Sequence, residues 1–361
     1  MAEYMSNSTT NSENLLHFRE VVEDDPFIAV YLLVTICLCM MGTCGNTLVL
    51  LTVIMNKKLH TVSNIFIVNL AVADIGVTSL VDAFTIVGII TSRQFLPPQT
   101  TLCAFVGSFC LICCSCSLWN IMAVGINRYI YICKSHLYRK IYTVPTTLAM
   151  AAAVWLSCFL LDFPNFVGWG DHGYDAKTMV CSYSRTASLS WLLFFVISAV
   201  LVPACIILYC YISVYLLVRN HGLTFTGGFQ RNTVRLKKKD IQLMKTLFAI
   251  FLVFITCWVP YAIVVVADVN DTWPHYIHIT VWIMAHGNSA LDSILYGVMN
   301  KQFRDGYAVI ISYIFCCCRE AILKSNRVGT TTVSVLSMPT KPESKATPRP
   351  IKLAGVEEVS L

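Results

Sequence analysis

Long apolar blocks decide what this chain can fold into, because each is long enough to cross a lipid bilayer. A hydrocarbon core about 30 Å thick needs about 20 helical residues, and within lipid a helix pairs its own backbone polar groups. Seven blocks reach that length, at 28–55, 65–90, 102–133, 146–169, 189–217, 243–267 and 276–299. Only 13% of the 361 residues are charged, which is about half the share in soluble domains. The sequence therefore predicts an all-α membrane protein, a seven-transmembrane helix bundle.

Basic residues gather on one side of the predicted bundle. Lys and Arg follow the first and third blocks and precede the sixth, whereas the opposite connections carry acidic and basic residues in near balance. Cytoplasmic loops are enriched in Lys and Arg, so we expect an extracellular N-terminus, a cytoplasmic C-terminus and a multi-pass place in the plasma membrane. The net charge of +6 then reflects these loops, and no nucleic-acid binding is expected.

The predicted domains follow from these spans. Residues 1–27 form an extracellular N-terminus without the apolar core of a signal peptide. Residues 28–315 form the seven-transmembrane domain, and 301–314 within it alternate basic and aromatic residues, as a short amphipathic helix on the inner membrane surface does. Residues 316–361 are rich in Ser, Thr, Pro and Lys, which predicts a disordered cytoplasmic tail.

Two of the seventeen cysteines lie on the predicted oxidising side of the membrane. Cys103 begins the third span, and Cys181 lies in the longest outer loop. We expect these two to form a disulfide that draws the loop over the bundle as a roof. Two free thiols are the alternative.

Two kinds of covalent modification are predicted outside the spans. Asn7 and Asn270 begin glycosylation sequons on the outer side, although Asn270 lies in a short loop near the membrane, where the absence of glycosylation is the alternative. Cys316, Cys317 and Cys318 follow the surface helix and form a candidate palmitoylation site.

Two aspartates lie deep inside spans, where an ionised Asp costs about 2.5 to 3.5 kcal/mol. They are Asp74 in the second span and Asp292 in the seventh. Polar neighbours are available at Asn46, Ser117, Asn288 and Ser289. Carboxylates among such oxygens predict either a bound sodium ion or a shared proton, and a polar core without an ion is the alternative. No other cofactor is predicted.

The sixth span carries an aromatic pair beside a proline. Pro260 removes one backbone hydrogen bond and bends the helix, which favours a hinge at this point. Phe254 and Trp258 are four residues apart, so they share a helix face, with Trp258 placed to contact a ligand and Phe254 to repack below it. Ordinary packing is the alternative.

The inner end of the third span carries Asn127-Arg128-Tyr129. The arginine needs a partner at this depth, and Asp240 at the start of the sixth span is the candidate. Tyr211 and Tyr296 bring hydroxyl groups to the same level, where they either join an activation switch or act only as interfacial anchors.

Taken in order, these motifs resemble the rhodopsin-like G-protein-coupled receptors over about residues 28–315. The matching residues are Gly45-Asn46 with Val49, Leu70 with Asp74, Cys103, Asn127-Arg128-Tyr129, Trp155, Pro203 with Tyr211, Cys257-Trp258-Val259-Pro260, and Asp292-Ser293-Ile294-Leu295-Tyr296. The resemblance implies that an extracellular small molecule binds and the sixth span moves outward. It also implies that a heterotrimeric G protein, of the inhibitory kind, docks against Arg128. Arrestin and membrane lipid are the further partners it implies.

Within that class the chain is most similar to the melatonin receptors. The similarity lies in the run from Asn127 to Ser135, in Pro164-Asn165, in Asn288-Ser289-Ala290-Leu291, and in Ser293, where most of the class has Pro. It implies a ligand site that contains Asn165, Tyr183, Arg185, Trp258, Tyr261, His286 and Cys110. Arg185, Ala199 and Ala262 replace a Gln, a His and an Asn of the melatonin receptors, so melatonin itself is not the expected ligand.

Two of these positions exclude other ligands of the class. Cys110 stands where amine receptors carry an aspartate, so a protonated amine would lack its counter-ion. His286 stands where opsins keep their Schiff-base lysine, which excludes a retinal photoreceptor.

Two functions outside this class are the alternatives. A transporter or channel would also place Asp74 and Asp292 in the membrane, but the chain shows no inverted repeat or Gly-rich interruption of its spans. An enzyme is not expected, because the spans contain no nucleophile with a base and no metal-ligand spacing such as His-x-x-x-His.

Overall fold

A computed structural model describes residues 23, 25–91, 101–222 and 238–313 of this chain. The helices are α2 (Pro26–Met55), α3 (Val62–Ile75), α4 (Asp82–Thr91), α5 (Thr101–Cys133), α6 (Ser135–Ile141), α7 (Val144–Asp162), α8 (Leu189–Phe195), α9 (Val202–Gly222), α10 (Lys238–Ala267) and α11 (His275–Met299). Single π-helical stretches, η2 (Gly76–Val81) and η4 (Val196–Leu201), join α3 to α4 and α8 to α9. Short 3-10 helices, η1 (Lys57–Leu59) and η3 (Phe163–Val167), follow α2 and α7.

Six helical stretches in the described part of the chain are long and apolar enough to cross a membrane. They are Pro26–Met55, Val62–Thr91, Thr101–Cys133, Val144–Val167, Leu189–Leu217 and Lys245–Ala267. The seventh helix, α11, is less apolar because its buried face carries His278, His286, Asn288 and Asp292. The predicted seven-helix bundle is confirmed.

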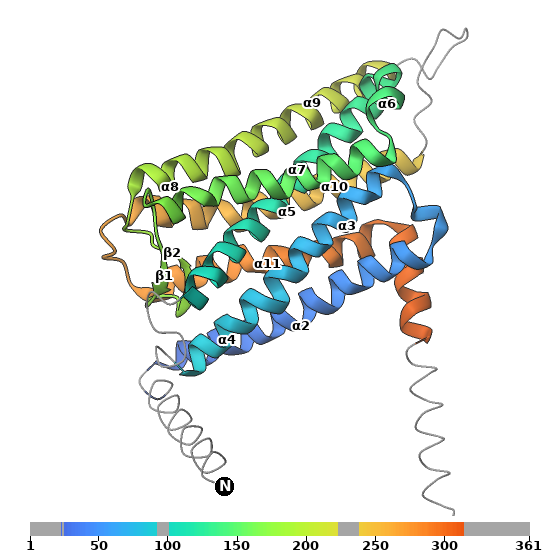
Figure 1. The fold of residues 1–361 in the computed structure, drawn as a ribbon. Helices are drawn as coiled ribbons and strands as arrows, with labels where there is room; N and C mark the ends of the chain where they lie inside the picture. The colour runs from blue at the N-terminus through green and yellow to red at the C-terminus, as the bar shows by residue number, and fades with distance from the viewer. Residues whose placement is uncertain (1–22, 24, 92–100, 223–237, 314–361) are drawn as a thin grey trace, which may run out of the picture. The chain divides into compact units, whose positions relative to one another are not determined.

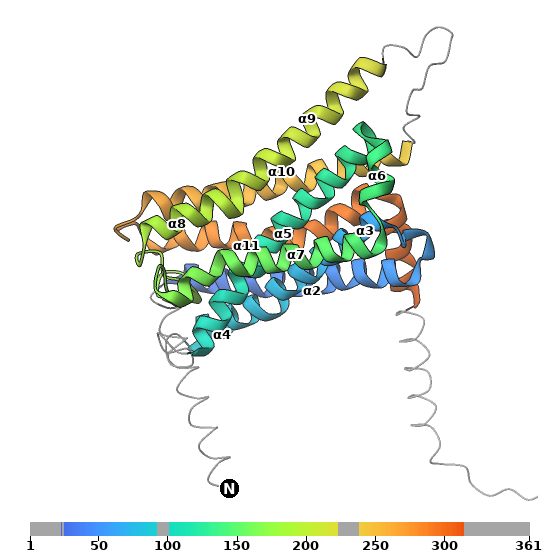
Figure 2. The same ribbon diagram turned by 45° about the horizontal axis from the view of Figure 1, so that its top comes forward.

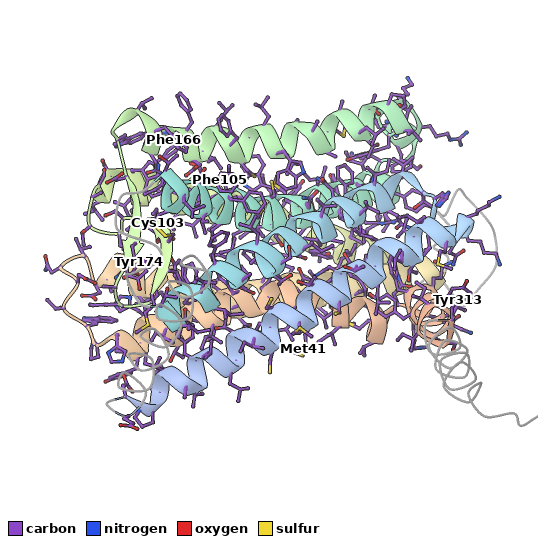
Figure 3. All side chains as sticks on the ribbon, turned by 60° about the horizontal axis from the view of Figure 1, so that its bottom comes forward. Met41, Cys103, Phe105, Phe166, Tyr174 and Tyr313 are labelled. Carbon is purple, nitrogen blue, oxygen red and sulfur yellow. A yellow bond between two sulfur atoms is a disulfide. The ribbon has the colours of Figure 1, made fainter. Side chains whose placement is uncertain are left out.

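The helices lie side by side, and α5 contacts α3, α7, α9 and α10 (Figures 1 and 2). Helix α11 packs between α10 and α2, which closes the bundle around α5. Apolar side chains also cover the outside of the bundle, as Met41 on α2 does in Figure 3. Such a surface is stable in lipid rather than in water.

Local sequence signals explain where the spans begin. Asp25 caps α2 by accepting a hydrogen bond from the backbone N–H of Phe27 (3.0 Å), and Pro26 fits the first turn because its missing N–H is not needed there. Thr143 and Thr146 form a reciprocal capping box at the start of α7. Polar capping residues therefore mark the ends of these apolar spans.

An antiparallel hairpin of β1 (His172–Asp175) and β2 (Val180–Tyr183) lies across one end of the bundle. The structure contains the expected disulfide from Cys103 of α5 to Cys181 of β2, with 5.1 Å between their Cα atoms. Tyr174 of β1 lies opposite Cys181 in the hairpin and packs beside the disulfide (Figure 3). The disulfide thus holds the hairpin over the helix ends.

Residues 301–313 form a further helix after α11, where the amphipathic helix was predicted. Phe303 of this helix is buried against Tyr296 of α11, with ring centroids 5.2 Å apart. Asn270 is exposed in the turn after α10. Asn7 and the cysteines at 316–318 lie outside the described residues, so their modification stays a prediction.

Candidate functional site

A cavity with about 40 Å³ of space for water-sized molecules lies beneath β2, between α5, η4, α10 and α11. Its lining is apolar and aromatic. The lining residues are Cys110, Leu111, Cys114, Ser115, Leu118, Ser182, Tyr183, Phe195, Ala199, Val200, Phe254, Trp258, Tyr261, Trp282, Ala285 and His286. Five of the seven residues expected at a ligand site are therefore together here: Cys110, Tyr183, Trp258, Tyr261 and His286.

Tyr183 forms the roof side of this cavity. Its ring packs on Trp191 with centroids 5.4 Å apart, and its hydroxyl accepts a hydrogen bond from the Tyr261 hydroxyl at 3.2 Å. Burial raises the pKa of Tyr183 to about 12, so the phenol is neutral at physiological pH. The two tyrosines present hydroxyl groups to a ligand without presenting charge.

Arg185 lines a smaller pocket next to the cavity, and the two share Ser182, Tyr183, Tyr261 and Trp282. Its guanidinium donates two hydrogen bonds of 3.1 Å to Asp175 and lies 2.9 Å from Asp271. It also lies 3.1 Å from His278 Nδ1. Two carboxylates already neutralise Arg185, so an acidic ligand is not needed to balance its charge.

The charges around Arg185 form one network at the outer end of the helices, which we call the outer network: Asp175, Lys177, Arg185, Asp268, Asp271 and His278. Asp268 is its centre, because it accepts from the backbone N–H groups of Thr272 (2.7 Å) and Trp273 (3.0 Å). His278 and Lys177 reach the same carboxylate at 2.8 Å and 3.4 Å. Each of its charges has an opposite charge or a donor beside it.

The structure places Asn165 outside the lining of the cavity. Its side-chain amide donates to Asp162 Oδ1 at 2.9 Å, and His172 Nε2 reaches the same oxygen at 3.0 Å. Ser108 donates to the other Asp162 oxygen. Asn165 thus belongs to a buried polar group that ties the end of α7 to α5 and β1, and its role as a ligand contact stays a prediction.

A buried pair of polar side chains, Asp82 and His286, crosses from α4 to α11 at the edge of the cavity. His286 Nδ1 lies 2.6 Å from Asp82 Oδ1, and the Trp282 ring packs on the His286 ring with centroids 4.1 Å apart. The other nitrogen of His286 faces Cys110 Sγ at 3.8 Å. The position that excludes retinal is therefore occupied by an oriented histidine.

The polar core lies below the cavity in the middle of the bundle. Asp74 Oδ1 accepts from Ser117 at 3.1 Å, and Asn46 donates to the backbone carbonyl of Ser289 at 2.9 Å. Asp292 is fully buried, and no donor among the described residues reaches either of its carboxylate oxygens or Asn288 Oδ1. Unpartnered carboxylate and amide oxygens are suitable ligands for a hard cation such as sodium.

The floor of the cavity is the aromatic pair of α10. Phe254 and Trp258 both line it and stack with ring centroids 5.7 Å apart, and Trp258 lies two residues before Pro260. A ligand that presses on Trp258 therefore also acts on Phe254 beneath it.

The inner end of α5 is tied to α3. Asn127 Oδ1 accepts a hydrogen bond of 2.6 Å from Ser63, and the Arg128 guanidinium lies 5.8 Å from the centre of the Tyr131 ring. Tyr129 packs on Tyr209 with centroids 5.8 Å apart. Asp240 lies in α10, but its side chain is outside the described residues, so the Arg128–Asp240 pair stays a prediction.

Tyr211 and Tyr296 are both buried, and no described residue hydrogen-bonds to either hydroxyl. Their rings instead pack on aromatic neighbours, Phe248 beside Tyr211 at 5.1 Å and Phe303 beside Tyr296 at 5.2 Å. The part of these two residues in an activation switch stays a prediction.

Three aspartates with clear structural roles were missed in the sequence. Asp82 lies inside the second apolar block, and Asp162 lies inside the fourth. The cost that singles out Asp74 at membrane depth applies equally to both, so this signal was available. Asp268 follows the sixth block directly, and nothing in the sequence indicates the five donors around it.

Comparisons with known proteins agree with this geometry. The profile of the family described as "7 transmembrane receptor (rhodopsin family)" matches residues 45–296. Melatonin receptor type 1B-B of Danio rerio is 30% identical over 331 residues, which cover 89% of this chain and 93% of that protein. Melatonin receptor type 1A of Mus musculus is 31% identical over 276 residues, covering 74% and 76%. The crystal structure of squid rhodopsin matches the fold with a TM-score of 0.70 at 21% identity, covering 85% of this chain and 93% of that one.

Proposed function

The chain belongs to the rhodopsin family of seven-transmembrane receptors and resembles the melatonin receptors, and from that membership we propose that it binds a small, flat, neutral molecule in the cavity above Trp258. It is a G-protein-coupled receptor and not an enzyme. The observation that carries the ligand proposal is the lining of the cavity, whose six aromatic residues surround a space without an unpaired charge.

Three features support a neutral ligand. Aromatic walls favour a flat ring, because stacked or edge-on rings add about 0.5 to 1.5 kcal/mol to the burial of area. Arg185 already faces Asp175 and Asp271, so it adds no net attraction for an acid. His286 faces Asp82 at the edge of the cavity, and no carboxylate is among the described residues that line it, so an amine would find no counter-ion there. The ligand-contacting hydroxyl groups are those of Tyr183 and Tyr261.

We also propose a sodium ion in the polar core, between Asp74 and Asp292. The unpartnered oxygens of Asp292 and Asn288 support this proposal, because a buried carboxylate without a partner is costly. A shared proton is the competing occupant. The ion would favour the inactive state if it binds that state more tightly.

On the inner side we propose coupling to an inhibitory G protein, with Arg128 in the docking surface and arrestin as a second partner. The basic residues of the connections around α6 and before α10 support a cytoplasmic position for that side. The N-terminus and the glycosylation sequons would then be extracellular.

The test measures nucleotide exchange on a purified inhibitory heterotrimer by the full chain in lipid nanodiscs. Three related probes differ in charge: neutral N-acetylated indoles, with melatonin as their reference, the cation tryptamine and the anion indole-3-acetate. We expect a neutral indole other than melatonin to accelerate exchange, and the two ions to have no effect. Trp258→Ala should abolish the response, whereas Phe159→Ala, which removes a lipid-facing ring on α7, should preserve it. A response to tryptamine or indole-3-acetate alone would contradict the proposal.

A further inference from the structure

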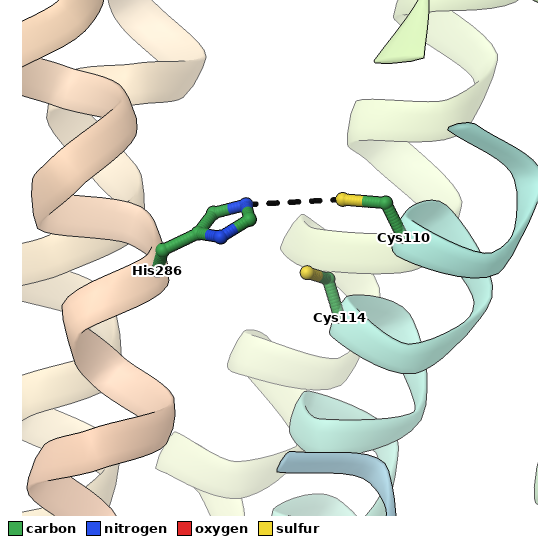
Figure 4. A group of neighbouring side chains, drawn as sticks. All are labelled: Cys110, Cys114 and His286. Atoms are coloured by element: carbon green, nitrogen blue, oxygen red, sulfur yellow. Dashed lines mark hydrogen bonds between the residues drawn. The ribbon is translucent and has the colours of Figure 1, made fainter. Parts of the chain in front are cut away.

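Three side chains of types that commonly bind transition metals lie together at one wall of the cavity. Cys110 and Cys114 lie one turn apart on α5, and His286 faces them from α11 (Figure 4). Their Sγ and Nε2 atoms all lie within 4.8 Å of one another, and Cys110 Sγ is 3.8 Å from His286 Nε2. All three residues are buried. Two cysteines and one histidine are thus brought to one point from helices far apart in the sequence.

A carboxylate orients the histidine toward the two sulfurs. His286 Nδ1 lies 2.6 Å from Asp82 Oδ1, and a carboxylate can only accept, so Nδ1 carries the proton and donates. In the neutral imidazole, the form that binds a metal, Nε2 then carries the lone pair that faces Cys110. A metal-binding histidine commonly has this arrangement, with its second ring nitrogen donating to a carboxylate. Trp282 packs on the imidazole at 4.1 Å and limits its rotation.

The spacing of these atoms fits a tetrahedral ion. Zinc binds a thiolate at about 2.3 Å and an imidazole nitrogen at about 2.0 to 2.1 Å, which separates two tetrahedral ligands, one sulfur and one nitrogen, by about 3.6 Å. The observed 3.8 Å from Cys110 to His286 is close to this separation. Small side-chain rotations would therefore bring all three ligands to bonding distance without moving a helix.

Charge also favours a divalent ion. Two buried thiolates carry two negative charges, which Zn²⁺ cancels and Cu⁺ would leave half-compensated. The two thiol protons leave for solvent when the ion binds, because the thiolate is the ligand. Soft sulfur ligands exclude magnesium and calcium.

We propose that Cys110, Cys114 and His286 bind a zinc ion in the wall of the cavity, with Asp82 as the positioning residue for His286. All three ligands line the cavity, so the fourth coordination position opens toward it. Water or a donor atom of a bound small molecule fills that position. The inference concerns the chain itself and does not depend on the G protein or the ligand proposed above.

Direct metal binding tests this proposal. The full chain in lipid nanodiscs is stripped with a chelator and titrated with Zn²⁺ alone, and bound zinc is counted by mass spectrometry of the element. All preparations carry Cys316→Ser, Cys317→Ser and Cys318→Ser, because three adjacent cysteines are candidate zinc ligands themselves. We expect one zinc per chain. Titration with Cd²⁺ should produce the ultraviolet charge-transfer band of a metal bound to thiolates.

Matched variants locate the ion. Cys110→Ser and Cys114→Ser should each lower the affinity at least 100-fold, whereas Cys113→Ser, the same change at a buried cysteine of α5 outside the cluster, should leave it unchanged. Asp82→Asn should lower the affinity by about 10- to 100-fold.

Three results would overturn the proposal, and the first two come from the wild-type site, so they do not depend on a variant folding. They are the absence of stoichiometric zinc, a disulfide between Cys110 and Cys114 in the purified chain, and full binding after both cysteines become serine. The third would move the ion to the other group of possible ligands, Asp268, Asp271 and His278.

Discussion

The outer network and the polar core both hold buried aspartates, but they differ in how these aspartates are paired. In the outer network, Asp268 faces two backbone N–H groups, His278 and Lys177. In the polar core, Asp292 is equally buried, and no described donor reaches its oxygens. The first region balances its charges within the protein, and the second has oxygens left over for an ion or a proton.

This difference separates two roles for buried charge. A paired charge stabilises one arrangement of the loops and helices, and breaking the pair leaves its partner exposed to an apolar surrounding. An unpartnered charge destabilises the fold until something binds to it, so its stability depends on the solution. We therefore expect the outer network to hold the β1–β2 hairpin in place over the helix ends. We expect the stability of the polar core to depend on the cations in solution.

The largest loss of stability should come from breaking the outer network. Arg185→Gln removes the cation that faces Asp175 and Asp271 and leaves two carboxylates close together, which should cost about 3 kcal/mol of unfolding free energy. The melting temperature of the purified chain measures this loss. Arg139→Gln, at an exposed position in α6, is the control and should leave it unchanged. Equal melting temperatures for both variants would show that the outer network does not stabilise the hairpin over the helix ends.

The polar core should respond in the opposite direction. Asp292→Asn removes a buried charge that lacks a described partner, so in sodium-free buffer it should raise the stability by about 1 to 2 kcal/mol. Thermal unfolding in N-methylglucamine chloride measures this gain. A loss as large as that of Arg185→Gln would mean that Asp292 is paired after all, and the comparison between the two regions would fail.

The pH dependence of the outer network sharpens the comparison. Burial alone raises the pKa of Asp268, but hydrogen bonds from Thr272, His278 and Trp273 outweigh it and hold the pKa well below its usual range. A lowered pKa in the folded state gives stability that is present above the unfolded value of about 3.9 and is lost as the pH falls toward the folded value. The destabilisation by Asp268→Asn should therefore be complete at pH 6 and smaller at pH 3.5. A constant difference in melting temperature would contradict this assignment.

The sequence predicts the helices that form both regions better than it predicts which side chains pair within them. Hydropathy places the third span at 102–133, and α5 runs from Thr101 to Cys133. The Cys103–Cys181 disulfide follows from topology, because only these two cysteines were expected on the oxidising side. The length of a span and the side of the membrane on which each loop lies are properties of single segments, so one sequence is enough to predict them.

Pairing depends on how each helix is rotated against its neighbours, which hydropathy does not report. Asp82 and His286 are 204 residues apart and meet only because α4 and α11 present these faces to each other. The amide nitrogen of Asn165 donates to Asp162, and no sequence pattern indicated this contact. Within single spans, the sequence showed no metal-ligand spacing such as His-x-x-x-His. The group of Cys110, Cys114 and His286 instead combines residues of two helices.

The smallest effect should appear at the inner end, where the predicted pair of Arg128 and Asp240 would lie near a partly wet surface and contribute little. Asp240→Asn keeps most of the capping ability of an N-terminal acid and removes its charge. If Asp240 holds Arg128 in the inactive state, its loss removes about 1 kcal/mol and raises nucleotide exchange without ligand several-fold. Ser63→Ala, which removes the 2.6 Å hydrogen bond to Asn127, is the matched change on α3 and should act in the same direction. Basal exchange equal to wild type in both, at matched receptor amounts, would leave Asp240 as a helix cap only.

The most direct test of the difference between the two regions is the melting temperature of the purified chain as sodium replaces N-methylglucamine at constant ionic strength. This measurement needs neither a ligand nor a G protein. At about five times the dissociation constant, sodium should stabilise wild type by about 1 kcal/mol, and Arg185→Gln should respond equally although it melts lower. Asp74→Asn should melt at the same temperature in both salts. A sodium response that survives in Asp74→Asn, or that is absent from wild type, would contradict the assignment of the polar core as the cation-responsive region.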